Sequence, residues 1–258
     1  MENSQEQEVI LIITDISGYT RFMLSNRQSL LHGQIIITEL TKAIIAQVDI
    51  PLEISKLEGD AIFLYALKTN DASWQDTSRQ IGQKLLAFLS AFSDKLLELG
   101  QSNTCPCEAC TFVEQLSLKI VVHSGQALLY QIGKFEELSG VDVIIVHRLL
   151  KNSVSANEYI LMTEAAYRDV QFPVEIPVTP GQETYDNIGR IKTYIYFPST
   201  AQESVAPLVP QRYSSIFYRL KNMALKELRS MLVNLGLVEL PKFKNLPVEE
   251  VGELNTDG

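Results

Sequence analysis

The sequence predicts an α/β (α+β) domain: a mixed sheet with helices packed mainly on one face, plus a C-terminal amphipathic helix. Short apolar runs rich in β-branched residues alternate with longer segments whose apolar residues recur at helical spacing. The elements follow the order strand, helix, strand pair, helix, strand pair, helix, strand. This order is typical of a mixed sheet, because paired strands form hairpins and the helices connect them.

The first half of the chain is expected to supply a strand, a hairpin and two long helices. The elements we expect are a strand over residues 9–15, a short helix from residue 20, a helix over 30–48, a hairpin over 52–67, a polar turn over 68–76 and a helix over 81–99. The hairpin turns at Gly59 and Asp60. Gly100 is expected to end the last of these helices as its C-terminal cap.

The second half is expected to add two strand pairs and two helices. The elements we expect are a strand pair over residues 116–123 and 126–132, a helix over 136–151, a strand over 159–162, a helix over 163–168, a loop over 173–181 and a hairpin over 185–197. Ser124 and Gly125 are expected to turn the first pair, Gly140 lies near the start of the helix, and Gly189 turns the last hairpin.

The chain is predicted to divide into one domain and an extension. Residues 1–197 form the domain, which is long enough for a large core. Residues 198–212 carry three prolines among small polar residues and are expected to be a linker. Residues 213–258 hold an amphipathic helix and a tail. We expect that helix to pack on its own domain or on a dimer partner; membrane attachment through its basic polar face is the minority alternative.

Composition excludes several classes of function. The formal net charge is −9, which argues against a nucleic-acid partner and against binding to anionic membranes, since both need a basic face. No apolar run approaches the roughly 18 residues of a membrane span. The first residues, MENSQEQE, are acidic and polar, unlike a signal peptide. The three cysteines lie within six positions and do not form a secreted disulfide framework, so we expect a cytoplasmic protein.

Residues 9–20, VILIITDISGYT, form the first candidate site. A buried apolar strand ends at Asp15, and a buried acid costs free energy unless it is paired, hydrogen-bonded or bound to a metal. Ser17 and Gly18 turn the chain, and Thr20 begins a short helix whose free N–H groups are expected to point at whatever Asp15 faces. This arrangement suits a cation that carries phosphates. A strand that simply ends in a capping aspartate is the alternative.

Residues 55–66, SKLEGDAIFLYA, form the second candidate site. Lys56 and Asp60 flank a tight turn that contains Gly59. Two acids at strand edges, one of them in a glycine turn, are reasonable ligands for Mg²⁺ or Mn²⁺.

Together these two stretches resemble the catalytic domain of class III adenylate and guanylate (nucleotidyl) cyclases. That family has an F-x-D-I-x-G-F-T strand-turn and a K-x-x-G-D hairpin, which stand here as ILIITDISGYT and KLEGD. LKIVVHSGQALLYQIG is similar to the family's next strand pair, and SGVDVIIVHRLLKN to its G-x-x-V-N-x-A-x-R helix. GRIKTYIY is similar to its final strand. The resemblance covers residues 8–197 and implies a ferredoxin-like sheet. We expect His123, in the third of these matches, to be a core or turn residue.

The resemblance also implies an activity and a partner. Such enzymes convert a nucleoside triphosphate into a 3′,5′-cyclic nucleotide and pyrophosphate, in a site shared by the two subunits of a head-to-tail dimer. By position, Asp15, Asp60 and the backbone of Ile16 would hold Mg²⁺ or Mn²⁺. The other residues that the resemblance places at the nucleotide are Ser17, Gly18, Tyr19, Thr20, Lys56, Gly59, Glu137 and Arg148. Asn152 and Arg190 are added as candidate substitutes where the chain departs from the family pattern.

Lys56 and Glu137 stand at the positions that select the base in this family. Lysine only donates hydrogen bonds and an ionised glutamate only accepts them, a pattern that fits adenine and mismatches guanine. We therefore expect ATP to be favoured over GTP, with CTP left open because cytosine offers the same pattern as adenine. Merely solvated surface charges are the alternative.

Two positions depart from the family pattern. Ile144 replaces the asparagine that contacts the ribose, and Asn152, one turn beyond Arg148 and on its face of the helix, is the candidate substitute. The lysine that grips the triphosphate is absent from its place, and Arg190 or Lys192 is expected to serve.

Cys105, Cys107 and Cys110 form a C-x-C-x-x-C loop, which also resembles an uncharacterised bacterial branch of cyclase-like proteins. Three thiolates at this spacing can hold Zn²⁺ with a fourth ligand from elsewhere. A redox-active or merely unpaired thiol cluster is the alternative.

Three functions are weighed on these residues. The first is a homodimeric, metal-dependent cyclase, which rests on the presence of Asp15, Asp60, Lys56 and Arg148. The second is a catalytically degenerate module that senses a nucleotide or a metal without turnover, favoured by Ile144 and the cysteines. The third is a scaffold that dimerises through the same face.

Overall fold

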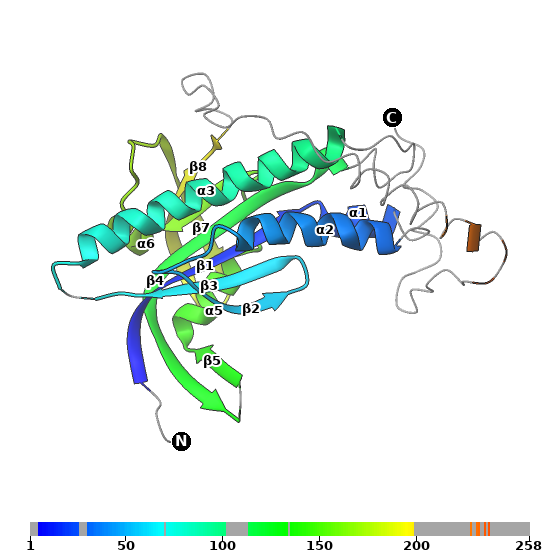
Figure 1. Ribbon diagram of the computed structural model, residues 1–258. Helices are drawn as coiled ribbons and strands as arrows, with labels where there is room; N and C mark the ends of the chain where they lie inside the picture. The colour runs from blue at the N-terminus through cyan, green and yellow to red at the C-terminus, as the bar shows by residue number, and fades with distance from the viewer. Residues whose placement is uncertain are drawn as a thin grey trace.

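The computed structural model describes residues 5–25, 30–69, 71–101, 113–133 and 135–198, together with positions 228, 231, 232, 235 and 237. One mixed sheet runs through the domain in the order β2-β3-β1-β4-β6-β8-β7, and β5 pairs with the end of β4 (Figure 1). The strands are β1 (Gln5–Ser17), β2 (Glu53–Glu58), β3 (Ala61–Leu67), β4 (Ser117–Ile132), β5 (Phe135–Ser139), β6 (Tyr159–Thr163), β7 (Val178–Tyr185) and β8 (Gly189–Tyr196). The predicted α/β class with a mixed sheet is confirmed.

Strand β1 is central because it is apolar on both faces. Its residues from Val9 to Ile13 are fully buried, and it pairs antiparallel with β3 on one side and β4 on the other. Successive side chains of a strand point to opposite faces. Ile10, Ile12 and Ile16 therefore belong to one apolar core, and Val9, Leu11 and Ile13 to a second core on the other face.

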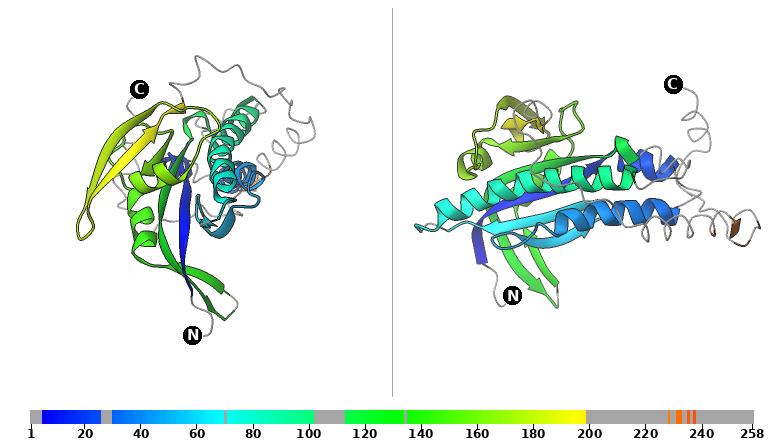
Figure 2. Two further views of the ribbon diagram at one scale, coloured as in Figure 1. Left: turned by 90° about the vertical axis from the view of Figure 1, so that its left-hand side faces the viewer. Right: turned by 45° about the horizontal axis from the view of Figure 1, so that its top comes forward.

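Helices cover both faces, but unequally. The helices are α1 (Tyr19–Ser25), α2 (Leu30–Ile45), α3 (Trp74–Gln101), α5 (Val141–Leu149) and α6 (Glu164–Asp169), with a 3₁₀ turn, η2 (Val113–Gln115). Apolar residues of α1, α2, α3 and α6 fill the first core, and those of α5 fill the second. Figure 2, left view, shows α5 and the α2–α3 pair on opposite sides of the central strands. Most helices thus lie on one face, as predicted.

Residues 116–132 do not form two strands that turn at Ser124 and Gly125, contrary to the prediction. They form the single long strand β4, which pairs with β1 from Ser117 to Leu129. Gly125 lies opposite Val9 within that ladder, and a Cβ there would lie 2.3 Å from the Asp142 carboxylate. The glycine is therefore needed for the close approach of α5 and makes no turn.

The predicted helix start at residue 136 is also wrong. Residues 135–139 form β5 against β4, and helix α5 begins only at Val141. Gly140, at the N-cap of α5, has a φ of 138°, a conformation that L side chains rarely adopt. The true hairpin is therefore β4–β5, and Gly140 marks the change from strand to helix.

Two further boundaries differ from the prediction. Helix α3 begins at Trp74, within the segment predicted to be a polar turn, and it continues past Gly100 to Gln101. The last hairpin begins at Val178, within the predicted loop, and turns over residues 186–188, before Gly189. The proline and glycine of β7, Pro180 and Gly181, lie on an edge strand, where a residue without an N–H donor is tolerated.

Other expectations lie mostly outside the described residues. These are the linker over 198–212 and the helix and tail over 213–258, of which only a few positions are described, and the cysteine loop. The domain boundaries stay predictions. Among the described helices, none combines the length and the apolar character that crossing a bilayer requires.

Candidate active site

Asp15 lies near the end of β1, on the α5 face of the sheet. Alternation along the strand places its side chain on the same face as Val9, Leu11 and Ile13 of the second core. It is the last residue of β1 in the ladder with β3, opposite Ala61. The Asp15 carboxylate thus follows the apolar side chains of this face, at the end of the pairing between β1 and β3.

Asp60 precedes β3 and is brought beside Asp15 by that ladder. Gly59 has a φ of 69° and a Cβ there would meet nothing within 4 Å, so its role in the turn is conformational. Burial and the nearby Asp15 carboxylate raise the pKa of Asp60 from 3.8 to about 6. Two neighbouring carboxylates repel each other when both are ionised. A cation bound between them would offset that repulsion.

Lys119, on β4, is a site residue that the sequence reasoning missed. Its ammonium donates to the Asp15 carboxylate at 2.7 Å, and it lies 3.5 Å from the backbone carbonyl oxygen of Leu150 at the end of α5. The ladder pairs Asp15 with Lys119, and Lys119 with Tyr159 of β6. A charged residue between the apolar residues Leu118 and Ile120 was the available signal.

The glycine turn after Asp15 joins the same site. Ile16 is buried and pairs with Leu118 of β4, while Ser17, Tyr19 and Thr20 are partly or fully exposed. Gly18 has a φ of 84°, and its carbonyl accepts a bond from the amide of Phe22 as α1 begins. Burial, and then Asp60, raise the pKa of Tyr19. The predicted turn and short helix are confirmed.

Among the described residues, no three histidine, cysteine, aspartate or glutamate side chains lie close enough to hold a metal ion. The pair Asp15 and Asp60 could still hold Mg²⁺ or Mn²⁺, because such ions in nucleotide sites use one or two carboxylates together with substrate phosphates. Ile16, whose backbone carbonyl is the further oxygen donor that the resemblance implies, follows Asp15 directly on β1. The donor set therefore fits a cation that arrives with a triphosphate.

Lys56 and Glu137 meet across the sheet edge. Lys56 on β2 donates to Glu137 on β5 at 2.7 Å, and both side chains are about one-third exposed. The hydrogen bond to Glu137 raises the pKa of Lys56. Two residues predicted to act on one base thus lie together, although 81 positions separate them.

Helix α5 places Ile144 and Arg148 on its exposed side. Ile144 is 55% exposed, and Arg148 lies one turn further along the same face. Asn152 differs, because its amide donates to the Leu149 carbonyl and to the Tyr159 hydroxyl, each at 2.8 Å, and its oxygen accepts the amide of Val154. Asn152 is thereby turned toward β6 and occupied within its own chain.

Arg190 is exposed near the start of β8. The ladders place Asp15, Lys119 and Tyr159 in one row across the sheet, and Tyr196 of β8 lies opposite Ile160, the next residue of β6. Arg190 lies six positions before Tyr196, which is roughly 20 Å of strand. Lys192, the alternative, pairs with Glu164 at 3.3 Å. Neither cation lies at the aspartate pair of the same chain.

His123 is a structural residue, as predicted. It is 7% exposed, and its ring nitrogens lie 2.9 Å from the Thr163 hydroxyl and from the Asp142 carboxylate. Cys105, Cys107 and Cys110 lie outside the described residues, so the zinc hypothesis stays a prediction.

Comparison with known proteins places the chain in a family. It is 31% identical over 159 residues to "Uncharacterized protein Rv2561/Rv2562" of Mycobacterium tuberculosis, covering 62% of this chain and 71% of that protein. The chain belongs to the family of that mycobacterial protein. Residues 37–159 also match the family described as "Protein of unknown function (DUF2652)".

Solved structures identify the fold. A bacterial light-regulated adenylyl cyclase is similar with a TM-score of 0.57 and 14% identity; the match covers 88% of this chain and 58% of that one. The guanylyl cyclase Cya2 is similar with a TM-score of 0.55 and 14% identity, covering 75% of this chain and 93% of that one. This chain therefore has the fold of class III adenylyl and guanylyl cyclase domains. The chain spans less than two thirds of the length of the light-regulated cyclase.

Proposed function

We propose that this chain is a homodimeric nucleotidyl cyclase, which converts a nucleoside triphosphate, ATP by preference, into a 3′,5′-cyclic nucleotide and pyrophosphate. The observation that carries the proposal is the set of Asp15, Asp60 and Lys119 at one open end of a cyclase-type sheet. Two neighbouring carboxylates beside one ammonium suit a cation and a polyphosphate together.

In the proposed reaction the ribose 3′-oxygen forms a bond to the α-phosphorus. The bond from that phosphorus to the bridging oxygen of the β-phosphate breaks, and pyrophosphate leaves with the electron pair. The hydroxyl proton passes to water. When bound, Mg²⁺ or Mn²⁺ makes the hydroxyl more acidic and neutralises the phosphates. Asp15 and Asp60 would hold the ion, and Lys119 would neutralise phosphate oxygens once it leaves Asp15.

A second copy of the chain would complete the site. Arg148 lies on the exposed face of α5, and Arg190 lies far along β8 from the aspartate row. Arg190 is too far from the aspartates of its own chain to serve them, and the exposed side of α5 leaves Arg148 accessible to a partner. We propose that the partner's copy of Arg148 stabilises the charge on the α-phosphoryl oxygens and its Lys56–Glu137 pair binds the base.

One observation favours a second candidate, a module that binds a nucleotide or a metal without turnover. Ile144 is exposed where the cyclase pattern has an asparagine, and an aliphatic side chain cannot hydrogen-bond to ribose. Asn152, the expected substitute, has its amide and oxygen occupied by Leu149, Tyr159 and Val154. Tight nucleotide binding without product would support this candidate.

The test is incubation of the purified chain with each nucleoside triphosphate and Mn²⁺, followed by detection of cyclic nucleotide and pyrophosphate. Asp15→Ala and Asp60→Ala should each abolish Mn²⁺-dependent nucleotide binding, because one carboxylate holds too little charge for the ion. Asp76→Ala is the matched control, since Asp76 is exposed on α3. Unchanged Mn²⁺ affinity in both site variants would refute the metal site.

A further inference from the structure

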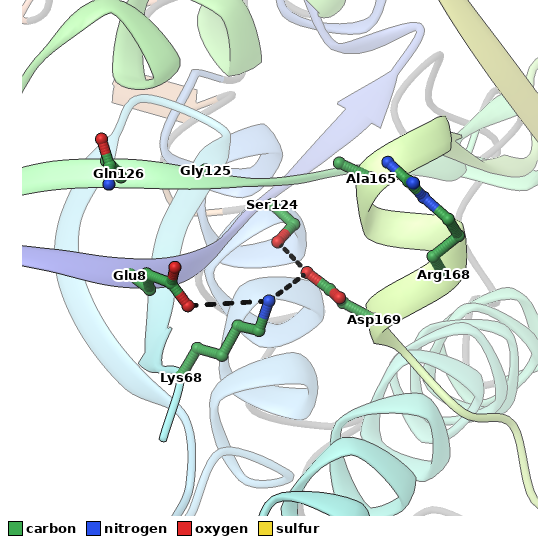
Figure 3. A pocket seen from close by; sticks show the side chains of 8 residues that line it. All are labelled: Glu8, Lys68, Ser124, Gly125, Gln126, Ala165, Arg168 and Asp169. Carbon is green, nitrogen blue, oxygen red and sulfur yellow. Dashed lines mark hydrogen bonds and ion pairs between the residues drawn. The ribbon is translucent and has the colours of Figure 1, made fainter. Parts of the chain in front are cut away.

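A second polar cavity lies away from the aspartate pair. It has a volume of about 390 Å³ and is bounded by the beginning of β1, the residue after β3, the middle of β4, and α6 (Figure 3). Glu8 of β1 lines it, and alternation places Glu8 on the face of Ile10 and Ile12, opposite to that of Asp15. The cavity is therefore separate from the proposed catalytic site in both position and face.

Charged groups that pair with one another form the floor of the cavity. The Lys68 ammonium lies 3.0 Å from the Asp169 carboxylate and 3.7 Å from that of Glu8. The Ser124 hydroxyl also donates to Asp169. The backbone carbonyl of Asp169 accepts a bond of 2.6 Å from the Ser78 hydroxyl of α3. Because the contacts of Asp169 come from Lys68, β4 and α3, the position of its carboxylate is held before any ligand arrives.

Arg168 supplies the other half of the cavity. Its side chain is exposed and lines the cavity, and its Nε atom donates to the Glu164 carbonyl at 3.4 Å. Within the described part of the chain, no carboxylate pairs with its guanidinium. The cavity thus joins two carboxylates, which share one ammonium, to a planar cation with terminal N–H groups available.

We propose that this cavity binds a small amino-carboxylate, such as a free amino acid. Its ammonium would lie at Glu8 and Asp169, and its carboxylate would receive a bidentate pair from Arg168. A simple anion would meet two carboxylates, and a simple cation would meet Lys68 and Arg168. Only a ligand with both charges is matched by both halves. The volume lies within the range of small-molecule sites.

The site is placed to act on the protein without competing with the nucleotide. Glu8 and Asp15 are carried by one continuous strand, and the described helix α6, which bears Arg168 and Asp169, packs against β4 and β6. Binding here would stabilise the native state, because a ligand that binds only the folded chain raises its free energy of unfolding.

The experiment is a calorimetric titration of the full chain with a panel of free amino acids. Methylammonium and acetate serve as probes for each half of the ligand. Arg168→Gln and Glu8→Gln each remove one charge from the cavity, and Arg79→Gln is the matched control on the exposed side of α3. Asp169 is left intact because its contacts hold α6 to the sheet. Thermal unfolding of each variant without ligand verifies that it folds.

We expect at least one amino acid to bind while methylammonium and acetate do not bind at the same concentration. Arg168→Gln and Glu8→Gln should each weaken that binding about tenfold or more, and Arg79→Gln should leave it unchanged. Three results would overturn the proposal: no binding by any amino acid, equal binding of acetate or phosphate, or affinities in the two cavity variants equal to that of Arg79→Gln. Since no step uses the nucleotide, the result is independent of whether the chain is a cyclase.

Discussion

The Lys119 ammonium donates to the Asp15 carboxylate at 2.7 Å across the ladder between β1 and β4. Both side chains are about one-fifth exposed, so water screens the pair only in part. Lys119 therefore neutralises part of the negative charge of Asp15, one of the two carboxylates at which a metal ion would bind. The charge of this lysine and that of the metal should compete for Asp15.

Lys119→Met should strengthen binding of Mn²⁺ to the nucleotide-free chain by about tenfold, because the competing positive charge is removed. Binding of a triphosphate should weaken at the same time. Calorimetric titration with Mn²⁺, and then with a non-hydrolysable ATP analogue, measures both effects. Lys95→Met is the control, since Lys95 pairs with Glu98 on α3. Weaker Mn²⁺ binding in Lys119→Met would show that the lysine supports the metal.

Asp60 should make the metal-free protein less stable as the pH rises. Its pKa is about 6 in the folded chain and 3.8 when unfolded, so the folded state holds the extra proton between these values. The free energy of unfolding should therefore fall from about pH 4 to pH 6 and stay low above that range. Asp60→Asn should remove this loss and stabilise the chain at pH 7, but not at pH 4.

At pH 7, Asp60→Asn should raise the free energy of unfolding by about 1–2 kcal/mol. This is less than the pKa shift alone would give, because Asp60 is only partly shielded from water. Denaturant unfolding of both proteins at the two pH values, without divalent ions, measures it. A stability difference that is the same at pH 4 and pH 7 would contradict the raised pKa.

Two glycines of helix α3 should respond oppositely to alanine. A Cβ at Gly82 would lie 2.1 Å from the backbone oxygen of Gln171, whereas a Cβ at Gly100 would lie 3.5 Å from the Glu114 side chain. Gly82→Ala should lower the free energy of unfolding by about 2–3 kcal/mol, since backbone must move. Gly100→Ala should be neutral or stabilise by up to about 1 kcal/mol through helix propensity. Equal effects in thermal unfolding would contradict the packing of α3 on the segment after α6.

The Lys56–Glu137 pair should favour ATP over GTP. Each mismatched hydrogen bond to guanine costs on the order of 1–3 kcal/mol, so two give about a hundredfold preference. Binding of non-hydrolysable ATP, GTP and CTP analogues with Mn²⁺, in the parent chain and in Lys56→Glu, measures it. Lys42→Glu is the control on exposed α2. Equal or tighter binding of GTP by the parent chain would rule out base selection by this pair.

The strands and helices with clear periodicity were predictable, and the boundaries set by glycine were not. Gly125 and Gly140 both resemble turn residues, but tertiary contacts decide their roles: Gly125 admits the Asp142 carboxylate, and Gly140 joins β5 to α5. Residues 135–139 carry two glutamates, which locally favour a helix over a strand, and pairing with β4 overrides that preference.

The candidate site was predictable only where a motif marked it. Asp15, Asp60, Lys56 and Glu137 stand in recognisable patterns. The ladder between β1 and β3 brings the two aspartates together, and a side-chain bond joins Lys56 to Glu137. Lys119 was missed because only strand register places it opposite Asp15. The cavity at Lys68 and Arg168 joins residues of β1, β4 and α6 to the residue after β3, and it has no sequence motif.

The most direct test of the account is a mixing experiment with two inactive variants, Asp60→Ala and Arg148→Ala. If the catalytic site is shared between two copies, each mixed dimer holds one intact site. An equal mixture should then recover about a quarter of the parent activity, measured as cyclic nucleotide formed with Mn²⁺, because half of the dimers are mixed and each has one working site of two. No recovery, after mass spectrometry has shown that subunits exchange, would contradict a composite site.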